Sequence, residues 1–175
     1  MSYYDFLKDY MKVDECKNNT KYSSTGHTFC WKKEDSTYAD GLYWFYEGDG
    51  FIIDVHDFYI REEVIQNNTY SMEDYVSIYS SYIVSANGEK FSPYQTITAN
   101  SLCTFDFDNI KDDFLFLLHK NSYYLAVSIG FKRELLEKHL LSININPESF
   151  YSTLLQTNQI ILTKALEKVA MEILN

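Results

Sequence analysis

Two carboxylates and an imidazole lie within four residues at Asp54-Val55-His56-Asp57, inside a run that is otherwise aromatic and β-branched. These groups could serve general acid–base catalysis, hold a metal ion or recognise a ligand. A solvated or hydrogen-bonded sheet face is the fourth interpretation. Because alternate residues of a strand point to opposite faces, Asp54 and His56 should share one face and Asp57 should lie on the other. A relay through all three groups is therefore not expected.

Other chemical motifs are few in this sequence. Asp54 and His56 have the i, i+2 spacing of two metal ligands on one strand, but further ligands would have to come from His27 or His119. There is no Gly-x-Ser-x-Gly motif and no glycine-rich phosphate loop. We therefore predict no catalytic residue, no bound metal and no cofactor.

The aromatic content is the second feature that bears on function. Phe, Tyr and Trp make up 17% of the chain, which favours strands and broad apolar surfaces. Aromatic walls with an occasional hydroxyl are typical of small-molecule cavities, and equally of a filled core. Four aromatic or polar residues on expected strands are the candidates for ligand binding, with ordinary packing as the alternative for each: Trp44, His56, Tyr82 and Phe105. Tyr82 and Phe105 are expected to point inward, whereas the orientation of His56 is not predicted.

Charge and cysteine spacing indicate the environment of the protein. The formal net charge is -10 and no basic cluster exceeds Lys32-Lys33, so direct binding of nucleic acid by this chain is not expected. Cys16, Cys30 and Cys103 are scattered and form no Cys-x-x-Cys motif, which predicts free thiols in a reducing cytosol. The sequence has neither a signal-peptide pattern nor an apolar run of membrane-spanning length. It therefore predicts a soluble, cytoplasmic protein without membrane contact.

Hydrophobic patterning predicts a short amphipathic helix over Tyr4–Val13, followed by a series of strands. The strands are expected at Thr25–Lys33, Leu42–Tyr46, Phe51–Ile60, Tyr75–Ser85, Thr96–Phe107, Phe114–His119 and Tyr123–Ile129. Turns are predicted at Gly48-Asp49-Gly50, Asn87-Gly88 and Lys120-Asn121. Since no helix separates these strands, they should pair antiparallel in a barrel or a sandwich.

Helical spacing replaces the strand pattern in the last quarter of the chain. Helices are expected over Phe131–Leu140, over Ser149–Leu155 with Pro147 in the first turn, and over Thr157–Leu174. Spacings of seven residues make an apolar stripe that could pack on the β structure or pair with a second copy of the chain. The residues of this predicted dimerisation stripe are Leu155, Leu162, Leu166, Val169 and Ile173.

A series of short motifs occurs in order along the expected strands: Ile53–Tyr59, Tyr75–Tyr79, Gly88-Glu89, Ser92-Pro93-Tyr94 and His119-Lys120-Asn121. Together they resemble the N-terminal sensor region of AraC-type transcriptional regulators. The resemblance covers roughly Leu42 to Leu140, and the helical tail fits the dimerisation segment of that family. The chain departs from the family after the last strand, where a proline-led, tyrosine-rich helix is usual. The family's DNA-binding helix-turn-helix domain has no counterpart in the 175 residues, so the chain is either part of a longer protein or a free-standing sensor. The acidic charge and the apolar stripe at the end favour a longer protein.

The resemblance implies a mainly β fold with some helix. Residues 1–140 would form a small antiparallel, cupin-like β-barrel with flanking helices, and residues 141–175 a helical dimerisation segment. Such a domain would bind a small-molecule effector, form a homodimer and control DNA binding by a C-terminal domain outside this chain. Two other functions stay open. One is a metal-dependent cupin-type enzyme, an isomerase or dioxygenase that uses Asp54, His56 and a third ligand; the other is a protein-interaction module.

Overall fold

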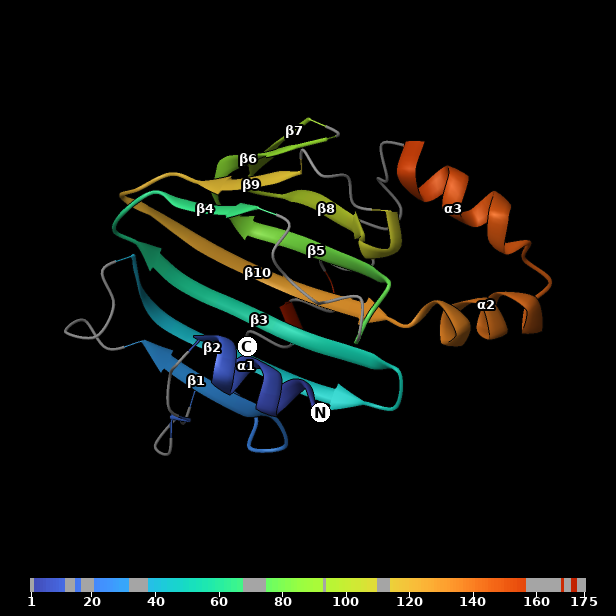
Figure 1. The fold of residues 1–175 in the computed structure, drawn as a ribbon, viewed down its shortest axis with the longest axis horizontal. Helices are drawn as coiled ribbons and strands as arrows, with labels where there is room; N and C mark the ends of the chain where they lie inside the picture. Colours follow the sequence, from blue (N-terminus) through green and yellow to red (C-terminus); the bar gives the residue numbers. More distant parts are fainter. Residues whose placement is uncertain are drawn as a thin grey trace.

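The computed structural model describes residues 2–11, 15–16, 21–31, 38–67, 75–92, 94–109, 114–156, 168 and 171–172. Over these residues the protein is mainly β, with two antiparallel sheets and few helices, as the sequence predicted (Figure 1). None of the described helices is both long and apolar enough to cross a membrane.

The large sheet has six strands in the order β1-β2-β3-β10-β5-β8. Their bounds, in this order, are β1 (His27–Trp31), β2 (Ala39–Gly48), β3 (Phe51–Ile60), β10 (Ser122–Phe131), β5 (Ile78–Ser85) and β8 (Ser101–Asp106). The long β2–β3 hairpin turns at Asp49 and Gly50, and Gly50 has a φ of 79°, which glycine adopts without strain. β3 begins and ends where the sequence predicted, because the turn and the β-branched run are both local signals.

The small sheet has four strands in the order β4-β9-β6-β7 and packs against the inner side of the large sheet. Their bounds are β4 (Val64–Asn67), β9 (Leu115–Leu118), β6 (Asn87–Phe91) and β7 (Gln95–Thr98). The prediction missed β4 and β6, and Asn87-Gly88 opens β6 instead of forming a turn. Glycine is needed at Gly88 because a side chain there would meet the backbone oxygen of Leu117 in β9. The single strand expected over Thr96–Phe107 is divided between β7 and β8 by a turn at Asn100, whose φ is 59°.

Side chains close the seam between the two sheets. Lys90 of β6 donates from Nζ to the carbonyl oxygen of Thr104 at 2.9 Å, and its cross-strand partner Gln95 donates from Nε2 to that of Leu102 at 2.6 Å. Both acceptors lie on β8, an edge strand of the large sheet. The two side chains thus take the place of a neighbouring strand. The described strands therefore form two sheets joined by side-chain contacts, and no closed barrel is found among them.

Of the α-helices with described bounds, the N-terminal one lies on the large sheet, and the others lie beyond its end. α1 (Tyr3–Met11) crosses the β1–β2 end of the large sheet, where Tyr3 and Leu7 are buried (Figure 1). α2 (Arg133–Ser142) and α3 (Pro147–Gln156) follow β10 and project beyond the end of the sheets. The predicted N-terminal helix and the helix led by Pro147 are both confirmed.

The start of α2 is fixed to the edge of the large sheet. Arg133 lies 3.0 Å from Asp106 at the end of β8, and 2.6 Å from Asp108 in the 3-10 turn η2 (Phe107–Asn109). Leu155 falls within α3, but its side chain is not described. The other residues of the predicted dimerisation stripe lie outside the described residues: Leu162, Leu166, Val169 and Ile173. The stripe therefore stays a prediction.

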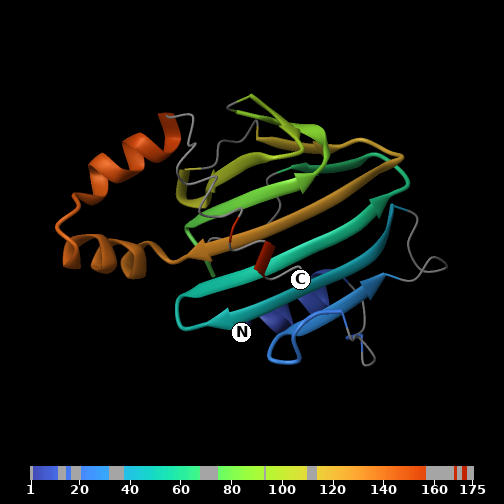
Figure 2. The ribbon, with the colours of Figure 1, turned by 180° about the vertical axis from the view of Figure 1, so that it is seen from behind.

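The large sheet has an inner face, toward α1 and the small sheet, and an outer face, which is turned to the viewer in Figure 2. β3 contributes Asp54 and His56 to the inner face, and Val55 and Asp57 to the outer face. Asp54 and Val55 are both fully buried. The predicted burial of β3 on both faces and the separation of Asp57 from His56 are confirmed.

The polarity of β5 is the reverse of the predicted one. Tyr82 was expected to point inward, but it packs on the outer face with Val55 and Val127. Ser81 faces inward and accepts a hydrogen bond of 2.9 Å from Ser128 of β10. Two small hydroxyl groups thus satisfy each other inside the fold. This pairing joins strands that are distant in the sequence, so alternation alone could not show it.

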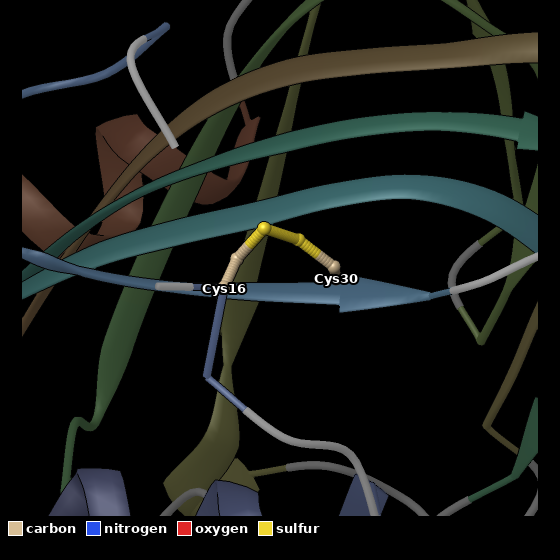
Figure 3. The surroundings of a disulfide bond; sticks show 2 residues. All are labelled: Cys16 and Cys30. Atoms are coloured by element: carbon tan, nitrogen blue, oxygen red, sulfur yellow. A yellow bond between two sulfur atoms is a disulfide. The ribbon is translucent and has the colours of Figure 1, made fainter. Parts of the chain in front are cut away.

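Cys16 and Cys30 form a disulfide, with their Cα atoms 5.4 Å apart (Figure 3). The amide of Cys16 also donates to the carbonyl oxygen of Thr28 in β1, at 2.6 Å. Cys103 is free and buried, and burial raises the pKa of its thiol to about 11. The pair corrects the prediction of three free thiols, because the two cysteines meet only through the fold. Disulfides persist mainly in oxidising compartments, so the bond does not fit the reducing environment that the cysteine spacing predicted.

Candidate functional site

A buried carboxylate, Asp54, stands at the centre of a hydrogen-bonded cluster on the inner face of β3. It is 0% exposed. Tyr79 of β5 donates to its carboxylate, 2.9 Å from Oδ1 and 2.7 Å from Oδ2, and Tyr43 of β2 donates to Oδ2 at 3.1 Å. Burial, and then the charge of Asp54, raises the pKa of both tyrosines well above the usual value, so their hydroxyls keep the protons they donate. The buried charge is thereby surrounded by donors, as its desolvation requires.

The same cluster orients His56, two residues further along β3. Its Nε2 lies 3.1 Å from Asp54 Oδ1 and 3.0 Å from the hydroxyl oxygen of Tyr79. Because the single hydroxyl proton of Tyr79 goes to Asp54, this hydroxyl can only accept from the imidazole, and the imidazole must carry a proton on Nε2. Nδ1 makes no hydrogen bond in the described part of the chain, and the side chain is 21% exposed. Nδ1 is therefore available to an external molecule.

Aromatic rings surround His56 on the inner face. The centroid of its ring lies 4.8 Å from that of Tyr43, 5.8 Å from that of Phe58 and 5.5 Å from that of Tyr124. Phe58 and Phe105 are only partly buried, and each packs against both core clusters of the inner face. The region between these clusters thus keeps imidazole and aromatic surface exposed, a combination that small-molecule sites use.

The cluster extends to α1 through Tyr3. The hydroxyl oxygens of Tyr3 and Tyr43 are 2.8 Å apart, and Tyr3 is the donor because Tyr43 gives its proton to Asp54. The backbone amide of Tyr3 donates to the carboxylate of Glu47 in β2, 3.1 Å from each oxygen. A carboxylate at this end of a helix also compensates the helix dipole. α1 is thereby tied to the carboxylate that orients His56.

The arrangement can bind a polar group and can transfer a proton at one nitrogen. A buried carboxylate that fixes the tautomer of an imidazole leaves the second ring nitrogen as a base or a hydrogen-bond partner. Among the described residues, no three His, Cys, Asp or Glu side chains are grouped so that they could hold a metal ion. His27 and His119, the further ligands considered from the sequence, pair with glutamates elsewhere.

The structure separates the four residues selected for ligand binding. His56 and Phe105 lie on the inner face, as expected for Phe105. Trp44 and Tyr82 lie together in a core cluster of the outer face. Trp44 also donates from Nε1 to the carbonyl oxygen of Ser23 at 2.9 Å, and its side chain is thereby fully engaged. Only His56 and Phe105 are brought to one region.

Sequence reasoning missed the tyrosines that hold Asp54. Tyr79 is 25 residues away from it, and Tyr43 is 11 residues away. A signal for Tyr43 was present, because a two-residue turn at Asp49-Gly50 fixes the hairpin register and places Tyr43 opposite His56. Tyr79 had no such signal, because its strand reaches β3 only through β10.

Comparison with family models, curated proteins and solved structures finds no match to this chain. Its function therefore has to come from the site itself and from the motifs of the sequence.

Proposed function

We propose that this protein is a ligand-sensing domain that binds a small molecule at the inner face of β3. The observation that carries the proposal is the state of His56. Asp54 and Tyr79 hold its Nε2, while Nδ1 and part of the ring stay available among aromatic side chains. A hydrogen-bonding group that is already positioned loses little conformational entropy when a ligand binds.

We infer further that the domain is the effector-binding and dimerisation part of an AraC-type transcription regulator. The sequence motifs carry this step, and the architecture supports it. Two antiparallel sheets around an aromatic inner face suit a cupin-like barrel that is open at its seam. α2 and α3 extend away from the sheets, where a dimerisation segment would have to be (Figure 1). DNA would be bound by a domain outside these 175 residues.

A route for signalling leads from the site to α2. The ring of Tyr79, which contacts the imidazole, lies 6.0 Å from that of Phe107 between centroids. Asp106 and Asp108, on either side of Phe107, hold Arg133 at the start of α2. A ligand that shifts Tyr79 would therefore favour one position of α2 and of the helices that follow it.

Thermal unfolding with a panel of sugars, aromatic acids and short peptides tests the site. A compound present at a hundred times its Kd should stabilise the protein by about 2.7 kcal/mol. His56→Gln should lose that stabilisation, and Asp57→Asn, on the outer face of the same strand, should keep it. Because a cytoplasmic regulator would hold Cys16 and Cys30 reduced, the panel is run with and without dithiothreitol. Equal responses of the wild type and His56→Gln would contradict a site at His56.

Sedimentation equilibrium tests dimerisation. The wild type should be a dimer at tens of micromolar, and Leu162→Lys should be a monomer because a charge would enter the apolar stripe. Glu172→Lys, at an exposed position, is the matched control and should stay dimeric. A strictly monomeric wild type would contradict the homodimer and leave the stripe for a different protein partner.

An enzyme is the second candidate, and the orientation of His56 favours it, because an imidazole held by a buried carboxylate can accept a proton at Nδ1. In the metal-dependent form, a cupin-type isomerase or dioxygenase, Asp54 and His56 would need a third ligand. Metal analysis of the purified protein separates the two functions. Stoichiometric iron, zinc or manganese that disappears in His56→Gln would replace the sensor with the enzyme.

A further inference from the structure

Lys90 is a buried ammonium group on the same side of the large sheet as His56, and no carboxylate among the described residues pairs with it. The side chain is 6% exposed. Its Nζ donates to the carbonyl oxygen of Thr104 at 2.9 Å and lies 5.2 Å from the centroid of the Phe105 ring. Neither partner carries a negative charge, and in the described part of the chain no ion pair is formed by Lys90.

This is an unusual environment for a lysine, because buried charges are normally paired. The adjacent Glu89 points to the other face of β6 and lies 2.8 Å from His119. Asp54, the buried carboxylate of the inner face, accepts its hydrogen bonds from tyrosines. An ammonium group has three donor hydrogens, and the described residues provide an acceptor for one of them, so two remain available at Lys90 for a further acceptor.

A series of aromatic rings connects Lys90 to His56. The ring of Phe105, below the ammonium group, lies 5.9 Å from that of Phe116 between centroids. Phe116 lies 6.2 Å from Tyr124, and Tyr124 lies 5.5 Å from His56. Lys90 and His56 therefore stand at two ends of one row of packed aromatic rings, of which Phe116 and Tyr124 are buried and Phe105 is partly buried. A cation lies at one end of the row, and at the other lies a ring nitrogen that bonds to no described residue.

We propose that Lys90 binds the acidic group of the ligand, so that the effector is a small organic anion with an apolar or aromatic body. This inference rests on the proposed function and names the class of molecule that the site binds. A carboxylate or sulfonate would form charge-assisted hydrogen bonds with the ammonium group, and the rings would cover the apolar body. Nδ1 of His56 would bind a second polar group. A neutral sugar would leave the charge of Lys90 uncompensated.

Two fluorescent probes with nearly the same aromatic body test this: 8-anilinonaphthalene-1-sulfonate, an anion, and N-phenyl-1-naphthylamine, which is neutral. The wild type should bind one equivalent of the sulfonate about tenfold more tightly than the amine. Lys90→Met should remove this preference, and Lys90→Arg should keep it. Lys120→Met, which removes an exposed lysine, is the matched control and should change neither affinity. Circular dichroism of each variant shows whether it is folded.

The outcomes separate this inference from the proposed function. Equal affinities of the wild type for both probes, or an unchanged preference in folded Lys90→Met, would overturn the role of Lys90. The proposed ligand-sensing function would still be supported if His56→Gln weakens binding of the neutral amine. Failure of both probes to bind the wild type would overturn both proposals. If Lys90→Met does not fold, Lys90→Gln takes its place, because it keeps a donor to Thr104 without the charge. If neither variant folds, the preference of the wild type for the sulfonate over the amine decides whether Lys90 has this role.

Discussion

The two faces of the large sheet are stabilised in different ways, and β3 shows the difference within four residues. On the inner face, Asp54 and His56 belong to a polar cluster that is closed off by tyrosine hydroxyls. On the outer face, Val55 is buried in an apolar cluster, and Asp57 pairs with Lys21 near the surface while accepting a hydrogen bond of 2.8 Å from Tyr22. Two aspartates of one strand thus have opposite surroundings.

This comparison separates groups that are positioned for function from groups that hold the fold. A buried polar cluster stabilises a fold less than apolar packing of the same volume does, because the cost of removing its polar groups from water offsets much of their mutual attraction. Its persistence on the inner face is understandable if it serves to orient His56. On the outer face, the polar groups near Val55 fasten the 21–25 segment to the sheet: Tyr22 donates to Asp57, and Trp44 donates to the carbonyl oxygen of Ser23.

The largest difference between the faces is expected for the two aspartates. Asp54→Asn should lower the free energy of unfolding by about 3–5 kcal/mol, because the buried hydroxyls of Tyr43 and Tyr79 both lose their charged acceptor, at about 1.5–3 kcal/mol for each hydrogen bond. Asp57→Asn should cost about 1 kcal/mol or less, since its partner Lys21 is largely exposed. Urea denaturation measures both. Equal losses would mean that the inner cluster is not buried as the structure has it.

The disulfide gives the next largest effect and belongs to the outer side of β1. Cys16 and Cys30 are separated by 14 residues in the sequence, and closing a loop of that size stabilises by about 3 kcal/mol. The double variant Cys16→Ser/Cys30→Ser should lose this amount, and dithiothreitol should then have no further effect on it. Thiol counting is the independent check: the unreduced, denatured wild type should show one free thiol, that of Cys103. Three free thiols would contradict the bond.

Removal of one hydrogen bond from the outer face should have a smaller effect. Trp44→Phe keeps most of the buried ring and loses the bond from Nε1 to Ser23, which should cost about 1 kcal/mol. Binding of any ligand found at the inner face should be unchanged. A change in ligand affinity as large as that of His56→Gln would show that the outer face takes part in the site, and would break the distinction between the two faces.

Local signals made part of this fold predictable. The turn at Asp49-Gly50 and the β-branched run that follows it gave the bounds of β3. The alternation of side chains between the two faces of a strand gave the separation of Asp57 from His56. Both depend on residues that are neighbours in the sequence. The cluster that gives His56 its role depends on Tyr79, whose strand is placed by long-range pairing with β10. Sequence alternation gives two faces but does not tell which one is covered, and this ambiguity produced the inverted assignment of Tyr82.

Short and irregular elements were the other source of error. β4 and β6 have four and five residues, and apolar and polar residue types do not alternate cleanly in their sequences. Gly88 was interpreted by its turn propensity, although its function in the fold is to let β6 approach Leu117 of β9 closely. Lys90 was not singled out at all, because its burial follows from the seam between the sheets and not from any local pattern.

The smallest effect is expected at His119, a histidine between carboxylates that, unlike His56, lies at the surface. Its Nδ1 and Nε2 lie 3.1 Å from Glu63 and 2.8 Å from Glu89, and a third of the side chain is exposed. Partial desolvation lowers the pKa of His119, but the hydrogen bond to Glu63 and the charges of both glutamates outweigh it and raise the pKa above 6.5. Because the folded-state pKa is the higher one, the stabilisation is complete below the unfolded-state pKa and is lost as the pH rises through the raised value.

His119→Gln should therefore destabilise the protein more at pH 5.5 than at pH 8.5, by a small amount that added salt reduces (about 0.15 M against about 1 M). Urea denaturation at the two pH values measures the difference, and an NMR titration of the imidazole measures the pKa directly. His139→Gln, which replaces an exposed histidine of α2, is the matched control for the loss of an imidazole. An identical loss at both pH values would mean that the glutamates do not hold the charged imidazole, and that surface pairs contribute to this fold through packing alone.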